Sequence, residues 1–455
     1  MIIVREKQNN NEIYFENEII QDKKTTCINE IYYRSFVKDK DDFTYLMLYD
    51  PNMNPISDVF EFLNYDKSAQ SINSRIKSLQ ALKLLYCYQS IINKQLEDFT
   101  TTDINGLKYF LKGISPKGQS ISFELISTRN NETVNGYLSV YRQFLTYLGK
   151  ENKALNAKSS KTTLVSLPDS EVDYKVDRFK SNEKVPKKVI EVPRYISVDE
   201  FQKIINLVRN NYSVREEIII RLMYQCGLRI GEVLGITADD LIMEELEGNY
   251  YPTLYIRNRI SDKPFQQAKT CMKLLDKKQY KSKDYRTKGY GYQTVIIPED
   301  LYNLINEYIE DAHITAREKK HNNYYSSTIA DRVRKSEEYE DDNYYVFINS
   351  LGRPLSVISW NNIIREIFVS VGIPIDSETR EHNLNHRFRH GFAMFNVQYL
   401  GCKELELKER MRHSNLQSVA CYFRPTTSDA IKVKTEFTKS LYEVIPELNK
   451  GGEEQ

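Results

Sequence analysis

The chain has 455 residues and a net charge of +1, with 40% hydrophobic and 28% charged residues. This length predicts two or three domains with separate cores, and the composition is that of a globular protein. No apolar run approaches the ~20 residues that cross a bilayer, and the start, MIIVREKQNNNEIYFENE, turns polar too early for a signal peptide. We therefore expect a cytoplasmic protein without a membrane partner. The six cysteines are scattered without a C-x-x-C pair, which predicts reduced thiols.

The first third of the chain changes from strand-like to helical patterns. Residues 1–60 combine a strand-like run, FTYLMLY, with turn residues, and no motif assigns a role to this N-terminal extension. Residues 61–150 are predicted to form a small, all-helical domain. Apolar residues of its first helix recur at steps of three and four, as one buried face requires: Ile72, Ile76, Leu79, Leu82 and Leu85. TTDINGLKYFLKGI and NNETVNGYLSVYRQFLTYLG predict two more helices, the first behind a Thr or Asp cap and the second ending at Gly149.

Two stretches are rich in basic residues. Residues 151–193 are polar and lysine-rich and contain three prolines, which predicts an extended basic linker between domains. Residues 261–290 carry nine Lys or Arg against three Asp, a local charge of +6. A solvated loop and a surface for DNA phosphates are both open for this second stretch. Its basic residues are Lys263, Lys269, Lys273, Lys277, Lys278, Lys281, Lys283, Arg286 and Lys288.

The remainder, residues 194–455, has a mixed pattern. Ser197 and Glu200 have the spacing of a capping box at the start of a helix. The β-rich runs TLYIRNRI and YQTVIIP flank the second basic stretch, and helical periodicity follows at 299–312 and 355–371. We therefore expect a chain that is mainly α with a small antiparallel β-sheet.

Three short stretches contain residue types that can act together on a phosphate. QCGLRIGEVLGI places Arg229 at the start of a helix, one turn before Glu232. NHRFRHGFAMF holds His386, Arg389 and His390, which share one face of a helix because they are three and four residues apart. The third stretch, MRHSNLQSVACYF, holds a histidine and, nine residues later, a tyrosine; these are His413 and Tyr422.

This set of side chains suits phosphoryl transfer to a tyrosine. Two guanidinium groups around one phosphodiester would stabilise the added negative charge of a pentacoordinate transition state. Histidines can transfer protons near neutral pH. A tyrosine can serve as the nucleophile, and we expect neighbouring cations to lower its pKa. No acidic cluster for Mg²⁺ lies near these motifs, so neither a metal nor a cofactor is expected.

Other interpretations of single residues stay open. Glu232 can be a supporting partner of Arg229 rather than a catalytic group. His390 can be a supporting or simply packed helix histidine. His382, His386 and His390 are spaced by fours, as in a metal site, but no cysteine or carboxylate set completes one. Trp360, the one tryptophan, is expected to anchor a core.

The three stretches together resemble the tyrosine recombinases, the integrases of phages and transposons. GLRIGE matches the family pattern G-L-R-x-x-E, and HRFRH matches H-x-x-R-H. RHSNLQSVACY matches G-H-S followed by a tyrosine nine residues after the histidine. Two positions differ: Arg412 stands where the family usually has Gly, which could change the local turn, and Arg387 stands where Asp is common.

The resemblance implies a role for each matched residue. Tyr422 would attack a DNA phosphate to form a 3′-phosphotyrosyl bond and release a 5′-hydroxyl. Arg229 and Arg389 would hold the phosphate, while His386 and His413 would assist proton transfer and hydrogen bonding. The family's lysine, on the turn of a β-hairpin, corresponds best to Lys288, with Lys281 and Lys283 as rivals. The basic stretch 261–290 would then contact DNA.

At the level of the whole chain, the resemblance implies a site-specific recombinase for integration, excision or transposition of a mobile element. Residues 61–150 would be the helical core-binding domain, and residues 194–455 the mixed α/β catalytic domain. Its partners would be double-stranded DNA with recombination sites, accessory DNA-bending or directionality factors, and further copies of itself. Dimers and tetramers would form on DNA through an amphipathic C-terminal helix in TTSDAIKVKTEFTKSLYEVIPEL, which could instead dock on its own domain. Two other functions remain: a DNA-binding regulator with this fold, and a relaxing enzyme similar to type IB topoisomerases.

Overall fold

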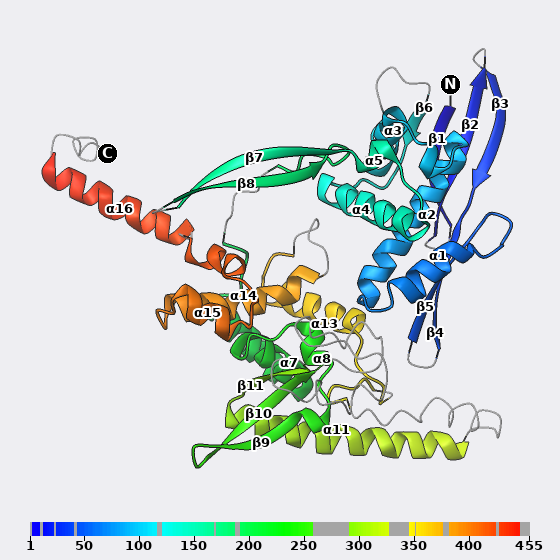
Figure 1. The fold of residues 1–455 in the computed structure, drawn as a ribbon. Coiled ribbons are helices and arrows are strands. Elements are labelled where there is room, and N and C mark those ends of the chain that lie inside the picture. Colours follow the sequence, from blue (N-terminus) through cyan, green and yellow to red (C-terminus); the bar gives the residue numbers. More distant parts are fainter. Residues whose placement is uncertain are drawn as a thin grey trace, which may run out of the picture. The chain divides into compact units, whose positions relative to one another are not determined.

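The computed structural model divides the chain into two compact units, with the main boundary between Lys187 and Lys188. That boundary lies inside the stretch 151–193, which we expected to link two domains. The structure describes residues 2–9, 12–21, 24–40, 43–115, 121–167, 170–186, 192–257, 291–326, 345–350, 352–375, 382–424 and 427–445. Figure 1 shows the elements of both units, which are described separately below.

Strands of the first unit come from the N-terminal extension and from inside the region expected to be helical. Four of them form a sheet in the order β3-β2-β1-β6: β1 (Ile2–Asn9), β2 (Glu12–Gln21), β3 (Lys24–Ile31) and β6 (Ile121–Glu124). β1 is antiparallel to β2 but parallel to β6. A separate antiparallel hairpin contains β4 (Arg34–Lys40) and β5 (Phe43–Tyr49), which confirms the strand predicted from FTYLMLY. The prediction that residues 61–150 are all helical is wrong at β6, because this short strand needs β1 as its partner.

Helices of the first unit include all three that the periodicity predicts. They are α1 (Ser57–Glu61), the π-helical turn η1 (Phe62–Asp66), α2 (Ile72–Ile92), the 3-10 turn η2 (Leu96–Asp98), α3 (Thr101–Lys112), α4 (Asn131–Tyr147) and α5 (Lys153–Asn156). Four of the five apolar residues predicted to face inward on α2 are buried: Ile72, Leu79, Leu82 and Leu85. The predicted stop after α4 is also present, since Gly149 has a φ of 66°.

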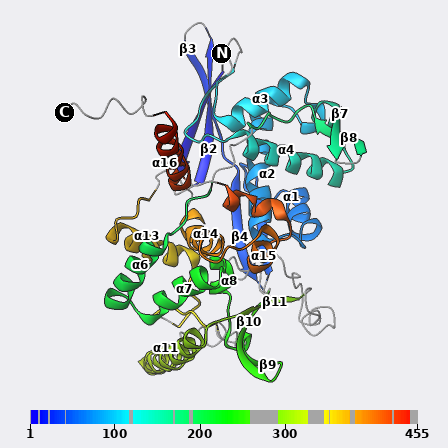
Figure 2. The ribbon, with the colours of Figure 1, turned by 90° about the vertical axis from the view of Figure 1, so that its left-hand side faces the viewer.

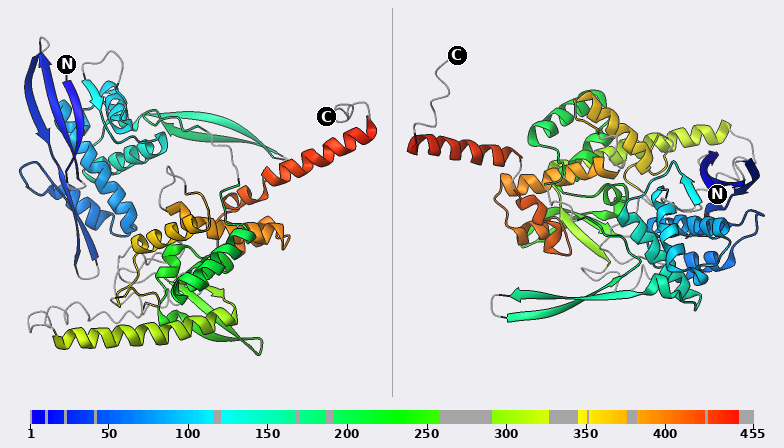
Figure 3. Two further views of the ribbon diagram at one scale, coloured as in Figure 1. Left: turned by 180° about the vertical axis from the view of Figure 1, so that it is seen from behind. Right: turned by 90° about the horizontal axis from the view of Figure 1, so that it is seen from above.

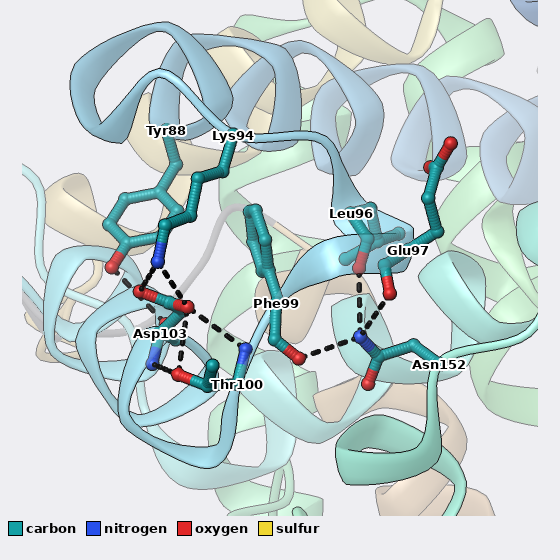
Figure 4. Close-up of polar contacts among 8 residues, drawn as sticks. All are labelled: Tyr88, Lys94, Leu96, Glu97, Phe99, Thr100, Asp103 and Asn152. Carbon is teal, nitrogen blue, oxygen red and sulfur yellow. Dashed lines mark hydrogen bonds and ion pairs between the residues drawn. The ribbon is translucent and has the colours of Figure 1, made fainter.

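Capping residues fix where α3 begins (Figure 4). The Thr100 hydroxyl accepts from the backbone N–H of Asp103, and the Asp103 carboxylate accepts from the backbone N–H of Thr100, which makes a capping box. Lys94 donates to the same carboxylate at 3.0 Å. Nearby, the side-chain amide of Asn152 donates to the carbonyls of Leu96 and Phe99 at 2.9 and 2.8 Å. These bonds satisfy the polar backbone of the turn before α3, which would otherwise be buried without partners.

The N-terminal strands share one hydrophobic core with the helices. Val4, Phe15 and Leu46 are buried in the same cluster as the apolar faces of α2 and α4. The fully buried Arg75 of α2 joins the two parts, because its guanidinium donates to the carbonyls of Thr44 and Leu63 at 2.8 and 2.9 Å. Residues 1–60 therefore belong structurally to the first unit rather than forming a separate extension.

Much of the expected linker is an antiparallel hairpin of β7 (Lys158–Leu167) and β8 (Ser170–Phe179). This two-stranded ribbon projects from the helices of the first unit (Figure 3). At its base, the backbone N–H of Lys180 donates to the carbonyl of Ala157 at 2.8 Å, and the Arg142 guanidinium lies 3.8 Å from the centre of the Phe179 ring. The prediction of an extended linker, which was based on prolines and lysines, is wrong for these two strands. The β-branched residues of TTLV and EVDYKV favour strands.

The second unit is mainly helical with a small antiparallel sheet, as predicted (Figure 2). Its sheet has the order β11-β10-β9, and α11 lies beside it. The elements are α6 (Val198–Asn211), α7 (Val214–Gln225), α8 (Ile230–Leu234), η3 (Ala238–Asp240), β9 (Leu241–Leu246), β10 (Asn249–Arg257), β11 (Tyr292–Ile296), α11 (Glu299–Ser326), α13 (Val357–Ser370), α14 (His382–Gln398), α15 (Glu404–Arg410), η4 (Leu416–Ser418), η5 (Ala420–Phe423) and α16 (Thr427–Val444). The capping box predicted at Ser197 and Glu200 opens α6.

Polar and steric contacts fix α14 against its neighbours. The indole N–H of the fully buried Trp360 donates to the Asn385 side chain at 2.6 Å, which ties α13 to α14 and confirms the predicted core anchor. On another face, a Cβ at Gly391 would lie 2.5 Å from the Tyr224 ring and 2.6 Å from the carbonyl oxygen of Ile196. α14 can therefore approach α7 this closely because residue 391 is a glycine.

Candidate active site

Arg229 stands at a tight turn between α7 and α8. Gly227 has a φ of 60°, and a Cβ there would lie 2.7 Å from the Phe392 ring, so the turn requires glycine. Arg229 is the residue before the first turn of α8, as its motif predicts. Its backbone N–H donates to Glu232 Oε2 at 2.9 Å and its Nη1 to Glu232 Oε1 at 2.8 Å. The Arg229 side chain keeps 20% of its surface exposed, whereas that of Glu232 has none.

Arg389 bridges two backbone segments from its position on α14. It is 2% exposed, its Nη1 donates to the carbonyl of Gly227, and its Nη2 donates to the carbonyl of Met411. Burial lowers its pKa to about 9, and the nearby charge of Arg229 acts in the same direction. Arg389 therefore holds together the turn before Arg229 and the turn before His413. The sequence could not reveal this, because the acceptors are backbone carbonyls.

His413 follows α15 through a left-handed turn at Arg412. Arg412 has a φ of 54°, so the turn keeps the backbone conformation that glycine favours although the residue is arginine. Its Nη2 donates to Glu232 Oε2 at 2.8 Å. His413 Nδ1 is buried and has no hydrogen-bond partner within the described residues. Burial, with the charges of Arg389 and Arg229, lowers the pKa of His413 to about 4.

Tyr422 and His390 are in direct contact. Tyr422, on η5, is 3% exposed, and its hydroxyl lies 2.6 Å from Nδ1 of His390 on α14. Burial is the largest influence on both groups. It raises the pKa of Tyr422 although Arg389 and Arg229 act to lower it, and it lowers the pKa of His390 to about 3. The neighbouring arginines thus act in the expected direction, but the expectation of a lowered tyrosine pKa is wrong for the protein without DNA, because burial outweighs them.

The remaining residues predicted for the site are His386 and the basic residues of 261–290. His386 lies on the same helix as His390, with 6.0 Å between ring centroids. Lys288 and the eight other basic residues of 261–290 lie outside the described residues. The strands on both sides of that stretch are paired, with Arg257 opposite Tyr292, so the intervening chain connects adjacent ends of an antiparallel hairpin. Among the described residues, no group of three or more His, Cys, Asp or Glu could hold a metal ion.

The arrangement defines a class of protein. It brings a tyrosine hydroxyl, a neutral histidine and two arginines together from separate segments, which suits covalent transfer of a phosphate group to tyrosine. The profile of the phage integrase family matches residues 194–428, more than half of the chain. The chain therefore belongs to the phage integrase family, and it is a tyrosine recombinase by class.

Relatives agree with this assignment. Transposase A from transposon Tn554 of Staphylococcus aureus is 24% identical over 412 residues, which cover 87% of this chain and 94% of the relative. Tyrosine recombinase XerH of Campylobacter jejuni is 22% identical over 260 residues, and tyrosine recombinase XerC of Caldanaerobacter subterraneus is 32% identical over 75 residues. The chain spans 54% of the length of that XerH and 21% of that XerC.

Two solved complexes are similar to this chain at low TM-scores. XerH bound to palindromic difH substrate has a TM-score of 0.47 and 13% identity, with 84% of each chain covered. The Tn1549 transposon integrase with transposon right-end DNA has a TM-score of 0.45 and 13% identity, with 84% of this chain and 98% of that chain covered. Among the described residues of the present structure, no helix has the length and apolar character that a membrane span requires.

Proposed function

We propose that this chain is a site-specific DNA recombinase that cuts and rejoins DNA through a 3′-phosphotyrosyl intermediate to move a mobile element. The observation that carries the proposal is the 2.6 Å contact between the Tyr422 hydroxyl and His390 Nδ1. A nucleophile in contact with a group that can take its proton is the arrangement that covalent catalysis needs. The long match to Transposase A, a protein named for transposition, favours a mobile element as the context.

The chemistry follows from the protonation states of the two groups. Burial keeps His390 neutral near pH 7, with a pKa of about 3, so its Nδ1 can accept a hydrogen bond from the Tyr422 hydroxyl. The negative charge of a bound DNA phosphate would raise that pKa and make His390 a stronger proton acceptor. The Tyr422 oxygen forms a bond to phosphorus, the bond from phosphorus to the 5′ oxygen breaks, and the hydroxyl proton passes to His390 Nδ1. The guanidinium of Arg229 stabilises the charge that develops on the phosphate oxygens, together with the remaining N–H groups of Arg389. The bond energy is kept in the phosphotyrosyl link, which the freed 5′-hydroxyl of a partner strand later attacks.

We propose a different division of roles among the histidines from the one that the resemblance implies. The motif assigned proton transfer to His386 and His413 and a supporting role to His390. We now favour His390 as the proton acceptor, because it touches the hydroxyl, and His413 as a phosphate ligand. His413 Nδ1 is buried without a partner within the described residues, and a phosphate oxygen or a water held by DNA would satisfy it.

Two further parts of the reaction belong to the basic stretch and the first unit. Lys288, on the connection between β10 and β11, would protonate the leaving 5′ oxygen. The other basic residues of 261–290 would contact DNA phosphates, which position the duplex without reading its sequence. The first unit would serve as the core-binding domain, with the N-terminal strands as part of it. Accessory DNA-bending or directionality factors would set the direction of the reaction.

Assembly on DNA would depend on α16. Apolar side chains on this helix are exposed, among them Ile431 at 60%, Phe437 at 64% and Val444 at 79%. They are not covered by the described parts of their own chain, which favours packing on a neighbouring copy over docking on the same domain. We propose dimers on a single site and tetramers when two sites are paired.

An assay on three DNA substrates tests the function against its alternatives. Plasmids would carry one or two copies of the DNA that flanks the coding sequence, or none, and excess EDTA would be present. A recombinase yields recombinant circles only from the two-site plasmid. Relaxation of all three supercoiled plasmids would instead indicate a topoisomerase. Binding to the flanking DNA without a covalent adduct would indicate a regulator.

A further inference from the structure

The turn between α15 and His413 has an unusual residue at its left-handed position. The backbone N–H of Arg412 donates to the carbonyl of Glu409 at 2.9 Å, and that of His413 donates to the carbonyl of Lys408 at 2.9 Å. This pair of bonds is the Schellman ending of a helix, in which the left-handed residue is usually glycine. Here it is Arg412, with a φ of 54°. A side chain in this conformation costs free energy that glycine would not, so its contacts must offset that cost.

Arg412 reaches a buried carboxylate on another segment. Its Nη2 lies 2.8 Å from Glu232 Oε2, and 9% of the Arg412 side chain and none of the Glu232 side chain are exposed. Glu232 also accepts from Nη1 and from the backbone N–H of Arg229. One carboxylate is therefore shared by two guanidinium groups that come from different ends of the second unit.

The shared contact matters because Glu232 would otherwise compete with a DNA phosphate for the Arg229 guanidinium. A carboxylate without exposed surface needs full compensation from its partners. Burial alone would raise the pKa of Glu232, but the charges of Arg412, Arg229 and Arg389, in that order, hold it below its ordinary value. Without Arg412, the carboxylate would depend on Arg229, and it would draw that guanidinium away from a DNA phosphate.

We propose that Arg412 is a positioning residue for DNA cleavage, which acts through Glu232 to hold the Arg229 guanidinium in the direction that the phosphate requires. The same link joins the turn that carries His413 to the turn that carries Arg229. This inference rests on the proposed recombinase function. Arg412 acts at a distance from the reacting atoms, and its effect passes through the shared carboxylate.

Single-turnover formation of the covalent adduct on a suicide substrate measures the effect. Arg412→Gly gives the turn its favoured residue and removes the guanidinium, and we expect adduct formation to slow by roughly ten- to a hundredfold, the range for a misplaced catalytic group. Arg412→Lys should recover part of the rate, because an ammonium can still pair with Glu232. Glu247→Gly is the matched control. Glu247 also has a left-handed backbone, with a φ of 52°, but it lies in the turn after β9. The Glu247→Gly protein should therefore cleave DNA at the wild-type rate.

The double variant with Glu232→Gln decides how Arg412 acts. If it acts through Glu232, the double variant is no slower than the slower single variant. Multiplied defects would mean that Arg412 contacts DNA itself, and wild-type cleavage by Arg412→Gly would remove it from the reaction; either result overturns the proposal. Urea unfolding of the wild type, Arg412→Gly, Glu232→Gln and the double variant tests the link between the two side chains without DNA. Additive effects of the two substitutions on stability would also overturn the proposal. If the wild-type protein formed no adduct, the recombinase function would fail, while the unfolding result would still decide the link.

Discussion

At the scale of single residues, the proposed reaction starts from the buried hydroxyl of Tyr422. Its pKa is raised, so the protein without DNA holds a neutral phenol rather than a preformed phenolate. His390 is neutral beside it, because burial lowers its pKa to about 3. In the proposed reaction, the proton would therefore leave during the attack on phosphorus, with the histidine in place to receive it.

The lowered histidine pKa values predict a pH dependence of stability. Above the ordinary histidine pKa of 6.5, both the folded and the unfolded chain hold neutral histidines. As the pH falls below that value, the unfolded chain binds protons that folded His390 and His413 do not bind until about pH 3 and 4, so the free energy of unfolding falls. His390→Asn keeps a polar side chain and removes one such group. We expect it to lose less stability than the wild type between about pH 7 and about pH 4.5 in urea unfolding. Parallel curves for the two proteins would contradict the lowered pKa of His390.

Arg389→Lys tests whether the guanidinium fork is needed. An ammonium has its three donors on one nitrogen, so it cannot span the carbonyls of Gly227 and Met411 and a phosphate as the wider guanidinium does. We expect single-turnover cleavage to fall by roughly 10²- to 10³-fold and unfolding to become easier by about 1.5–3 kcal/mol. Arg387→Lys is the control, because Arg387 donates to the carbonyl of Pro374 at 2.9 Å on the same helix. It should cleave at a rate near that of the wild type; equal rates for both variants would remove Arg389 from the site.

The positions of the candidate site residues on their helices could be predicted from the sequence, but the contacts among their side chains could not. Arg229 at a helix start, and His386, Arg389 and His390 on one helix, followed from spacing, because a helix places residues three and four apart on one face. Contact between His390 and Tyr422 did not follow, since it depends on how η5 packs against α14. The link between Arg412 and Glu232 has one visible signal in the sequence, an arginine where a glycine turn is expected.

At the scale of elements, the close approach of α14 to α7 positions three of the motif residues. Gly391→Ala should destabilise the protein by about 1–3 kcal/mol and slow cleavage, because the added carbon meets Tyr224 and the Ile196 carbonyl and shifts α14. Gly136 on α4 is a matched position, where a Cβ would meet the flexible end of Lys77 at 3.2 Å. Gly136→Ala should therefore stabilise by up to about 1 kcal/mol. Thermal unfolding measures the stability of both variants. Equal destabilisation by both would show that the close contacts at Gly391 do not cause the loss of stability.

Elements with strong periodicity were predictable, and those with distant partners were not. α2, α3 and α4 follow from local spacing and caps, and the β10 and β11 strands from their β-branched and aromatic residues. β6 is four residues long and exists because β1 lies beside it. The β7–β8 hairpin was not predicted, because the prolines and lysines of this stretch are also typical of a linker. A strand's pairing partner is a long-range property that local composition does not contain.

At the scale of the whole molecule, α16 has apolar side chains that no described part of its own chain covers. Truncation after Thr427 removes its exposed apolar residues, so single-site DNA binding should persist while dimers, tetramers and recombination are lost. Phe437→Ser, which removes one exposed ring, should weaken assembly in the same direction, and the exposed Thr435→Ser should have no effect. Light scattering and gel shifts on one and two sites measure the assemblies. Tetramers formed by the truncated protein on paired sites would show that another surface carries assembly.

The central claim is that Tyr422 is the nucleophile, and the covalent adduct on a suicide substrate tests it most directly. Tyr422→Phe keeps the buried ring and loses the hydroxyl beside His390, so it should bind DNA like the wild type and form no adduct. Tyr399→Phe is the control, because Tyr399 directly follows α14 and is 63% exposed, and its variant should form the adduct normally. The account predicts that denaturing gels show the protein–DNA band for the wild type and Tyr399→Phe and none for Tyr422→Phe. An adduct that persists in Tyr422→Phe would contradict it.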